Sequence, residues 1–181
     1  MGQYFTPVFL NSTGSIVHAL NPADYGSGDK LAGNTRADMP LIHATQVLLS
    51  LDGALRLVWA GDNADDEPNE DPSLYCAVQP HHFVRIGELL HRDCRESPNM
   101  SLPDPERRNV FGVVYNEDKR EFVDHVSLPV DDTGWRRTPL PRLTAEAGPG
   151  AEGRALGTWA RDRLCYRQQR PDGDWADVTA I

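Results

Sequence analysis

The spacing of apolar residues predicts short strands at the start of the chain, followed by one helix. Aromatic and β-branched residues surround a single proline over 4–10, which favours an edge strand, and a polar turn at 11–14 leads to a return strand over 15–20. A helix is predicted within 35–51, with a proline in its first turn. Leucine and tryptophan then alternate with other residues over 54–60, which is the period of another strand.

Turn residues divide the rest of the chain in the same way. The further predicted elements are a strand over 74–78, a helix from Pro80 to about Cys94, a hairpin of strands 110–115 and 121–126 with its turn at 116–119, and strands over 156–169 and 175–181. Residues 129–153 are rich in proline and glycine, which predicts a long ordered loop or a linker. About two helices among hairpin-connected strands indicate an α+β fold with a mainly antiparallel sheet.

Length and composition agree with one globular domain. The 181 residues are 39% apolar and 25% charged, which excludes a disordered chain, a collagen-like fibre and a coiled coil. At this length roughly 70% of the surface of the unfolded chain can be buried, which is enough for a core. We therefore expect residues 1–181 to form a single domain with many turns.

The net charge is strongly negative and unevenly distributed. It is −9 for the whole chain, and residues 1–75 alone carry −7, because they hold three cations and ten acids. A nucleic-acid-binding protein normally has a basic surface, so nucleic acid is disfavoured as a partner. We expect the partner to be another protein.

The cysteine count and the apolar runs bear on the compartment. Three cysteines are an odd number, and polar residues and a proline interrupt the apolar start of the chain, so we expect no secretory leader. No apolar run approaches the 18 residues of a membrane helix. We expect a cytoplasmic protein with free thiols that does not enter a membrane.

One short sequence occurs twice, one hundred residues apart. Trp-Ala-x-Asp occupies 59–62 and again 159–162, each time where a predicted strand meets polar residues. We expect Trp59 and Trp159 to be buried in the core, with the two aspartates at the rim of the sheet bonding backbone amides. In the alternative interpretation, both tryptophans and Arg161 line a binding surface on which the two aspartates converge.

Four segments resemble a group of uncharacterised proteins from bacteriophages and actinobacteria. Members of the group open with a Met-Gly-Gln-Tyr strand, here 1–4, and carry a later segment similar to Tyr-Gly-Ser-Gly-Asp-Lys-Leu at 25–31. Residues 59–65 and 156–162 are similar to two further motifs, but the glycine-rich loop before the second is interrupted by proline here, at 148–153. The resemblance covers roughly a quarter of the chain. It implies a compact shared fold and a phage or mobile-element context, and it implies no reaction.

An acidic segment raises the question of a cation site. Six of the ten residues at 62–71 are acidic, but they lack the glycine and glutamate positions of an EF-hand. Asp62 and Asp65, with Asp162 brought in by the fold, are the candidate metal ligands and catalytic residues. A metal-dependent hydrolase or nuclease is therefore the alternative function, whereas a solvated loop is the simpler interpretation.

Cysteine and histidine are concentrated between 76 and 94. The residues are Cys76, His81, His82, His91 and Cys94. Zinc binds such side chains in tetrahedral sets, but no Cys-x-x-Cys occurs, so we predict no structural zinc and no other cofactor. Metal analysis of protein purified without chelator would contradict this prediction if it gave about one zinc per chain.

The remaining patterns do not form a catalytic constellation. Cys165 and His125 would make a nucleophile and base only if the fold brought them together. Arginine alternates with aromatic residues over 154–170, a pattern that stacks bases in some proteins but more simply makes a solvated strand surface. Tryptophan, tyrosine and arginine are also the residues that dominate protein interfaces. The sequence therefore predicts a non-enzymatic protein that acts through protein contacts.

Overall fold

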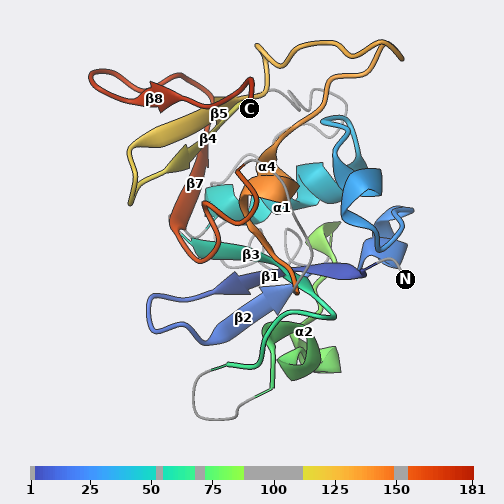
Figure 1. Ribbon diagram of the computed structural model, residues 1–181. Coiled ribbons are helices and arrows are strands. Elements are labelled where there is room, and N and C mark those ends of the chain that lie inside the picture. Colours follow the sequence, from blue (N-terminus) through green and yellow to red (C-terminus); the bar gives the residue numbers. More distant parts are fainter. Residues whose placement is uncertain (1–2, 52–54, 68–71, 88–111, 149–154) are drawn as a thin grey trace.

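A single twisted sheet organises the molecule (Figure 1). The computed structural model describes residues 3–51, 55–67, 72–87, 112–148 and 155–181. The strands within these ranges are β1 (Phe5–Leu10), β2 (Ile16–Ala19), β3 (Leu55–Gly61), β4 (Val113–Asn116), β5 (Glu121–Asp124), β6 (Ala145–Glu146), β7 (Arg163–Arg167) and β8 (Ala176–Asp177). Their order is β2-β1-β3-β7-β4-β5-β8, with β6 beside β3. Most pairs are antiparallel, so the predicted α+β fold is confirmed.

Helices cover both faces of the sheet (Figure 1). Within the described ranges they are α1 (Pro40–Leu51), α2 (Leu74–Ala77) and α4 (Leu140–Leu143), with 3-10 turns η1 (Pro22–Tyr25), η2 (Leu31–Asn34) and η4 (Pro80–His82). α1 begins at Pro40, later than the sequence suggests, because the residues before it pair with another segment. The Ala37 amide donates to the carbonyl of Arg136 at 3.0 Å, and the Thr138 amide donates to that of Thr35 at 2.7 Å.

The prediction of β1 as an edge strand is wrong, because β1 lies between β2 and β3. Pro7 is compatible with this interior place because β2 pairs with β1 only from Val8 onward. On the other side Pro7 lies opposite Trp59, whose amide donates to the carbonyl of Thr144 at 2.9 Å. The β1–β3 ladder therefore does not need the N–H that proline lacks.

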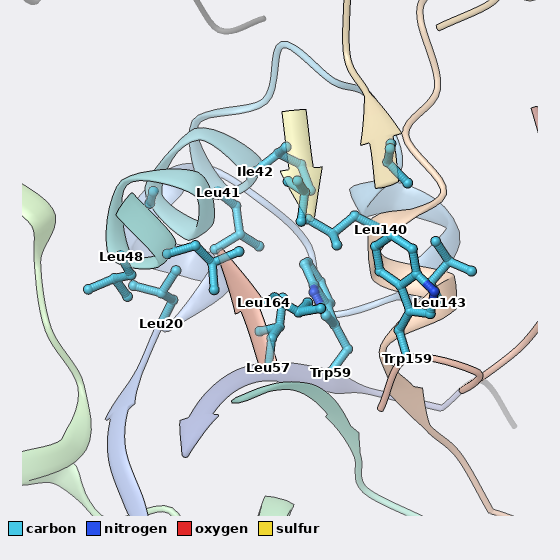
Figure 2. Packing of buried hydrophobic residues seen from close by; sticks show 14 of the residues in the cluster. Leu20, Leu41, Ile42, Leu48, Leu57, Trp59, Leu140, Leu143, Trp159 and Leu164 are labelled. Atoms are coloured by element: carbon cyan, nitrogen blue, oxygen red, sulfur yellow. The ribbon is translucent and has the colours of Figure 1, made fainter. Parts of the chain in front are cut away.

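The main hydrophobic core lies between the sheet, α1 and α4 (Figure 2). Leu57 and Trp59 of β3 and Leu164 of β7 point into it, together with leucines of both helices. Alternate residues of β3 face the other way, where Val58 packs with β1 and with Leu74 of α2 in a second, smaller cluster. Side chains of β3 point alternately to the two faces of the sheet. Because both faces are covered, most residues of β3 are apolar.

The hairpin predicted over 110–126 is confirmed from residue 112 onward. β4 and β5 pair antiparallel, with Asn116 opposite Glu121, so the turn occupies 117–120, one residue later than predicted. The strand predicted over 74–78 is wrong, because these residues form α2. The helix predicted from Pro80 starts as a 3-10 turn that becomes extended at Phe83, and residues 86–87 are helical. The rest of the predicted helix lies outside the described residues.

The C-terminal part of the chain is less regular than its sequence suggests. The proline- and glycine-rich segment contains α4 and β6, and both leucines of α4 are fully buried in the core. The strand predicted over 156–169 is limited to β7, because residues 155–161 form consecutive turns. Three of these residues have a positive φ, namely Ala155 and Arg161 at 64° each and Gly157 at 70°. The strand predicted over 175–181 is limited to the two residues of β8.

Candidate functional site

Asp62 directly follows β3 and is hydrogen-bonded to Tyr4, which precedes β1. Its amide donates to the carbonyl of Tyr4 at 2.9 Å, and its Oδ1 accepts from the Tyr4 amide at 3.0 Å. The prediction that Asp62 bonds a backbone amide at the rim of the sheet is confirmed. Asp65, three residues later, is exposed.

Asp162 lies in a different environment. Its Oδ2 accepts a hydrogen bond from Asn116 Nδ2 at 2.7 Å and forms an ion pair with Lys119 Nζ. Both partners belong to the β4–β5 hairpin, so Asp162 ties the turn before β7 to that hairpin. The prediction that Asp162 bonds a backbone amide is wrong, because its carboxylate instead contacts two side chains of the hairpin.

The acidic residues near β3 take part in separate structural contacts. Asp66 Oδ1 accepts from the Ser73 amide at 3.3 Å, and Glu67 pairs with Arg161. Across the described residues, no group of three His, Cys, Asp or Glu side chains could hold a metal ion. The structure thus does not place Asp62, Asp65 and Asp162 in the one site that the hydrolase alternative needs.

Trp59 and Trp159 are both fully buried, as predicted (Figure 2). Figure 2 shows the two indoles on either side of Leu140, with Leu164 beside Trp59 and Leu143 beside Trp159. Their positions differ in polarity. Trp159 Nε1 donates to Glu121 Oε2 at 2.5 Å, whereas Trp59 Nε1 has no hydrogen-bond partner among the described residues. Neither ring is available to a ligand in this conformation.

Arg161 holds two acidic side chains together instead of facing an open site. Its Nε and Nη2 donate to the two carboxylate oxygens of Glu146 at 2.5 and 2.9 Å, and its Nη1 donates to Glu67 Oε2 at 2.8 Å. These charge-assisted bonds raise the pKa of Arg161 above its ordinary value, and Glu146 contributes most. Because Glu67 belongs to the acidic segment and Glu146 to β6, Arg161 attaches that segment to β6.

The structure describes only some of the other sequence candidates. Cys76 is exposed, while His91 and Cys94 lie outside the described residues. Cys165 Sγ is directed at Glu117 Oε1 at 3.5 Å, and burial raises the pKa of its thiol to about 11. Ring nitrogen Nε2 of His125 lies 2.8 Å from Thr138 Oγ1. Cys165 and His125 therefore have different partners, and a thiol with a raised pKa is a poor nucleophile at neutral pH.

A loop that follows β5 exposes an apolar surface that the sequence reasoning missed. It spans residues 126–137 and extends away from the body of the molecule (Figure 1). Val126 and Val130 are each 57% exposed and Trp135 is 41% exposed, so three of the six large exposed hydrophobic residues found in the described ranges lie on this loop. We call it the Trp135 loop.

Asp131 fixes the conformation of the Trp135 loop. Its Oδ1 accepts from the amide and the hydroxyl of Thr133 and from the amide of Trp135, at 2.9, 2.6 and 3.0 Å. Its Oδ2 accepts from Arg137 Nε at 2.6 Å. These bonds, above all those from Thr133, hold the pKa of Asp131 well below its usual range. The loop is therefore ordered by hydrogen bonds among its own residues.

Trp135 itself is held by an arginine from another part of the chain. The guanidinium carbon of Arg36 lies 3.5 Å from the centroid of the Trp135 ring, and Arg36 also pairs with Asp38 at 2.7 Å. Beside this stack is a small pocket of about 180 Å³, bordered by Ala37 and Gly134. The turn sequence Asp-Asp-Thr-Gly followed by tryptophan at 131–135 is the signal from which a rigid, exposed aromatic residue could have been predicted.

The search of the described residues for membrane helices and the comparisons with known proteins gave no matches. Within the described ranges, no helix has the length and apolar character needed to cross a membrane. Comparison of the chain with protein-family models finds no match, and comparisons with curated proteins and with solved structures find none either.

Proposed function

We propose that the protein is a non-enzymatic binding protein, from a phage or mobile-element context, that engages a partner protein through the Trp135 loop. The observation that carries this proposal is an exposed tryptophan on a loop whose conformation is already fixed. Tryptophan and arginine are the commonest energetic centres of protein interfaces, and an ordered loop loses little conformational entropy on binding. The scattered acidic side chains support a binding role over a catalytic one.

The charges of the Trp135 loop suggest the character of the partner surface. Arg36, Arg136 and Arg137 are offset by three acids in the same region, Asp38, Asp131 and Asp132. A locally neutral surface with an apolar centre favours a partner groove that accepts an indole ring over a strongly charged partner.

Site-specific photo-crosslinking tests the proposal. A photoreactive phenylalanine analogue is placed at Val130 on the loop and, as a control, at exposed Ser12 in the turn between β1 and β2. We expect a discrete covalent adduct with one host protein from Val130 and not from Ser12. The substitution Trp135→Ala should remove the adduct, whereas Ile181→Ala, at another exposed apolar residue, should not. Equal labelling from both positions, or an adduct that survives Trp135→Ala, would reject the loop as the binding surface.

A further inference from the structure

A cleft lies where the chain leaves β7 and returns to β8. Its volume is about 460 Å³, and Tyr115, Arg167, Gln169, Arg170, Asp172 and Trp175 line it. None of these residues belongs to the Trp135 loop, although Arg170 donates a hydrogen bond to Ser127 near the start of that loop. The cleft combines aromatic side chains with two arginines at a protein surface.

The aromatic part of the cleft is firmly positioned. Tyr115 is buried, and its hydroxyl donates to the carbonyl of Gln169 at 2.5 Å, which holds the segment after β7 in place. Trp175 meets Tyr115 edge to face, with ring centroids 5.2 Å apart and planes inclined at 77°. The cleft thus has an apolar wall whose shape does not depend on a ligand.

Contacts within the protein position the two arginines, and both side chains remain largely exposed. The guanidinium of Arg167 lies 5.0 Å from the centroid of Tyr115, and its Nη2 is 3.4 Å from Glu117 Oε1. Arg170 donates through Nε to Asp124 Oδ2 at 2.6 Å and through Nη2 to Ser127 at 2.7 Å. Their side chains are nonetheless 61% and 53% exposed. Each guanidinium has five N–H donors, so each retains donors for a ligand.

We propose that this cleft binds a single carboxylate that is joined to a planar or apolar group. The guanidinium fork matches the two oxygens of a carboxylate, and Trp175 supplies the surface for the attached group. Asp172 lines the cleft, and Glu117 and Asp124 pair with its two arginines, so these acids would repel a doubly charged phosphate more than a singly charged carboxylate. Two ligand sources share this chemistry, namely the C-terminal aromatic residue of a peptide and a free aryl carboxylic acid.

Titrations followed by NMR of the ¹⁵N-labelled full chain test the proposal. The probes are 4-hydroxyphenylacetate, its neutral amide, phenyl phosphate, and an acetylated tripeptide ending in tyrosine with a free or an amidated C-terminus. We expect saturable shifts of the backbone amides at 168–175 and of the Trp175 indole with the carboxylates, at least tenfold tighter than with the matched amides. Tighter binding of the tripeptide than of the free acid would identify a peptide, and the reverse order would identify a small molecule.

Substitutions assign the binding to the named side chains. Arg167→Gln should abolish the preference for acid over amide, and Trp175→Ala should weaken acid and amide alike. Arg163→Gln is the matched control, because Arg163 lies on the same strand but pairs with Asp118. Arg167 is well exposed, so its variant keeps the test valid even if Trp175→Ala fails to fold. Absent or unsaturable shifts, equal binding of acid and amide, or tighter binding of phenyl phosphate would overturn the proposal. Neither Arg167→Gln nor Trp175→Ala changes a residue of the Trp135 loop, so the crosslinking experiment tests the proposed function separately.

Discussion

His125, which follows β5, is a histidine whose charge is set by its surroundings. Its side chain is fully buried, Nε2 is hydrogen-bonded to Thr138, and Nδ1 has no partner among the described residues. Burial lowers the pKa of His125 to about 4, although the neighbouring Asp124 acts in the opposite direction. The folded protein therefore holds a neutral imidazole at any pH above about 4.

This histidine makes stability fall as the solution becomes mildly acidic. An unfolded chain takes up the proton near the ordinary histidine pKa of about 6.5, whereas the folded chain does so only near 4. Between these values the unfolded state binds more protons, so the free energy of unfolding decreases as the pH falls. We expect a loss of about 2 kcal/mol from this group between pH 7 and pH 5, measured by urea unfolding.

The variant His125→Gln separates this effect from the other titrating groups. Glutamine keeps a polar group near Thr138 but cannot be protonated. The decrease in the free energy of unfolding between pH 7 and pH 5 should therefore be smaller in this variant, by most of the about 2 kcal/mol expected from the histidine. An unchanged slope in His125→Gln would show that the buried ring is not responsible.

The two buried tryptophans allow a matched comparison of one hydrogen bond. Trp59→Phe and Trp159→Phe remove similar volumes from the same core, but only the second also removes the bond from Nε1 to Glu121. A bond to a charged acceptor contributes about 1.5–3 kcal/mol, and the partial exposure of Glu121 lowers the cost of losing it. We expect Trp159→Phe to be the more destabilising by about 1–2 kcal/mol in urea unfolding. Equal costs would mean that water replaces the indole at Glu121.

At the scale of elements, the apolar pattern and the turn residues predicted those features that depend on residues close together in the sequence. The β4–β5 hairpin and the alternation of β3 are of this kind. The sequence could not show that β1 is interior, because that place depends on its pairing with β3, which begins more than forty residues after β1 ends. It also could not show that Glu67, Glu146 and Arg161 meet, since three separate segments supply them. The burial of both tryptophans was predictable, whereas the contacts of Asp162 were not.

The segment after β6 is attached to the turn after β3 by a close backbone approach. A Cβ atom at Gly148 would overlap the carbonyl oxygen of Asn63, which is backbone and cannot rotate away. We expect Gly148→Ala to lower the free energy of unfolding by about 1–3 kcal/mol, the usual cost of overpacking. Thermal unfolding followed by circular dichroism measures the effect.

Gly28 provides the matched control for this glycine. A Cβ atom there would meet no heavy atom within 4 Å, and its φ is not in the left-handed region. Gly28→Ala should therefore be neutral or raise stability by up to about 1 kcal/mol. If both substitutions proved neutral, the segment at 148 would be able to move away from Asn63, and the tight approach would not constrain the fold.

At the scale of the whole molecule, the sheet has a narrow seam. β3 and β7 pair at two register positions, Leu55 with Leu164 and Arg56 with Arg163, and this pairing joins β2-β1-β3 to β7-β4-β5-β8. The core bridges the same seam, because Leu164, Trp59 and residues of α1 belong to one hydrophobic cluster. Packing, more than strand pairing, therefore makes the two parts of the sheet one unit.

This arrangement predicts a single cooperative unfolding transition. Tryptophan fluorescence and far-ultraviolet circular dichroism should give the same urea midpoint. Leu164→Ala should lower that midpoint for both probes together, at a cost of about 2–5 kcal/mol, while Ile181→Ala on the surface should change it little. Two separate midpoints, in the parent or in Leu164→Ala, would show that the parts of the sheet unfold independently.

The position of β3 has a consequence for how the chain is made. β3 ends at residue 61 and its neighbour β7 begins at residue 163, so about one hundred residues are synthesised between them. Until β7 leaves the ribosome, the first part of one edge of β3 is unpaired, because β6 pairs only with Trp59 and Ala60, and the core still lacks the residues of β7. Pairings this distant in sequence slow folding and expose strand edges that can associate with other chains. The last steps of folding must therefore wait until β7 has been synthesised and has left the ribosome, and chaperone demand should be greatest just before that moment.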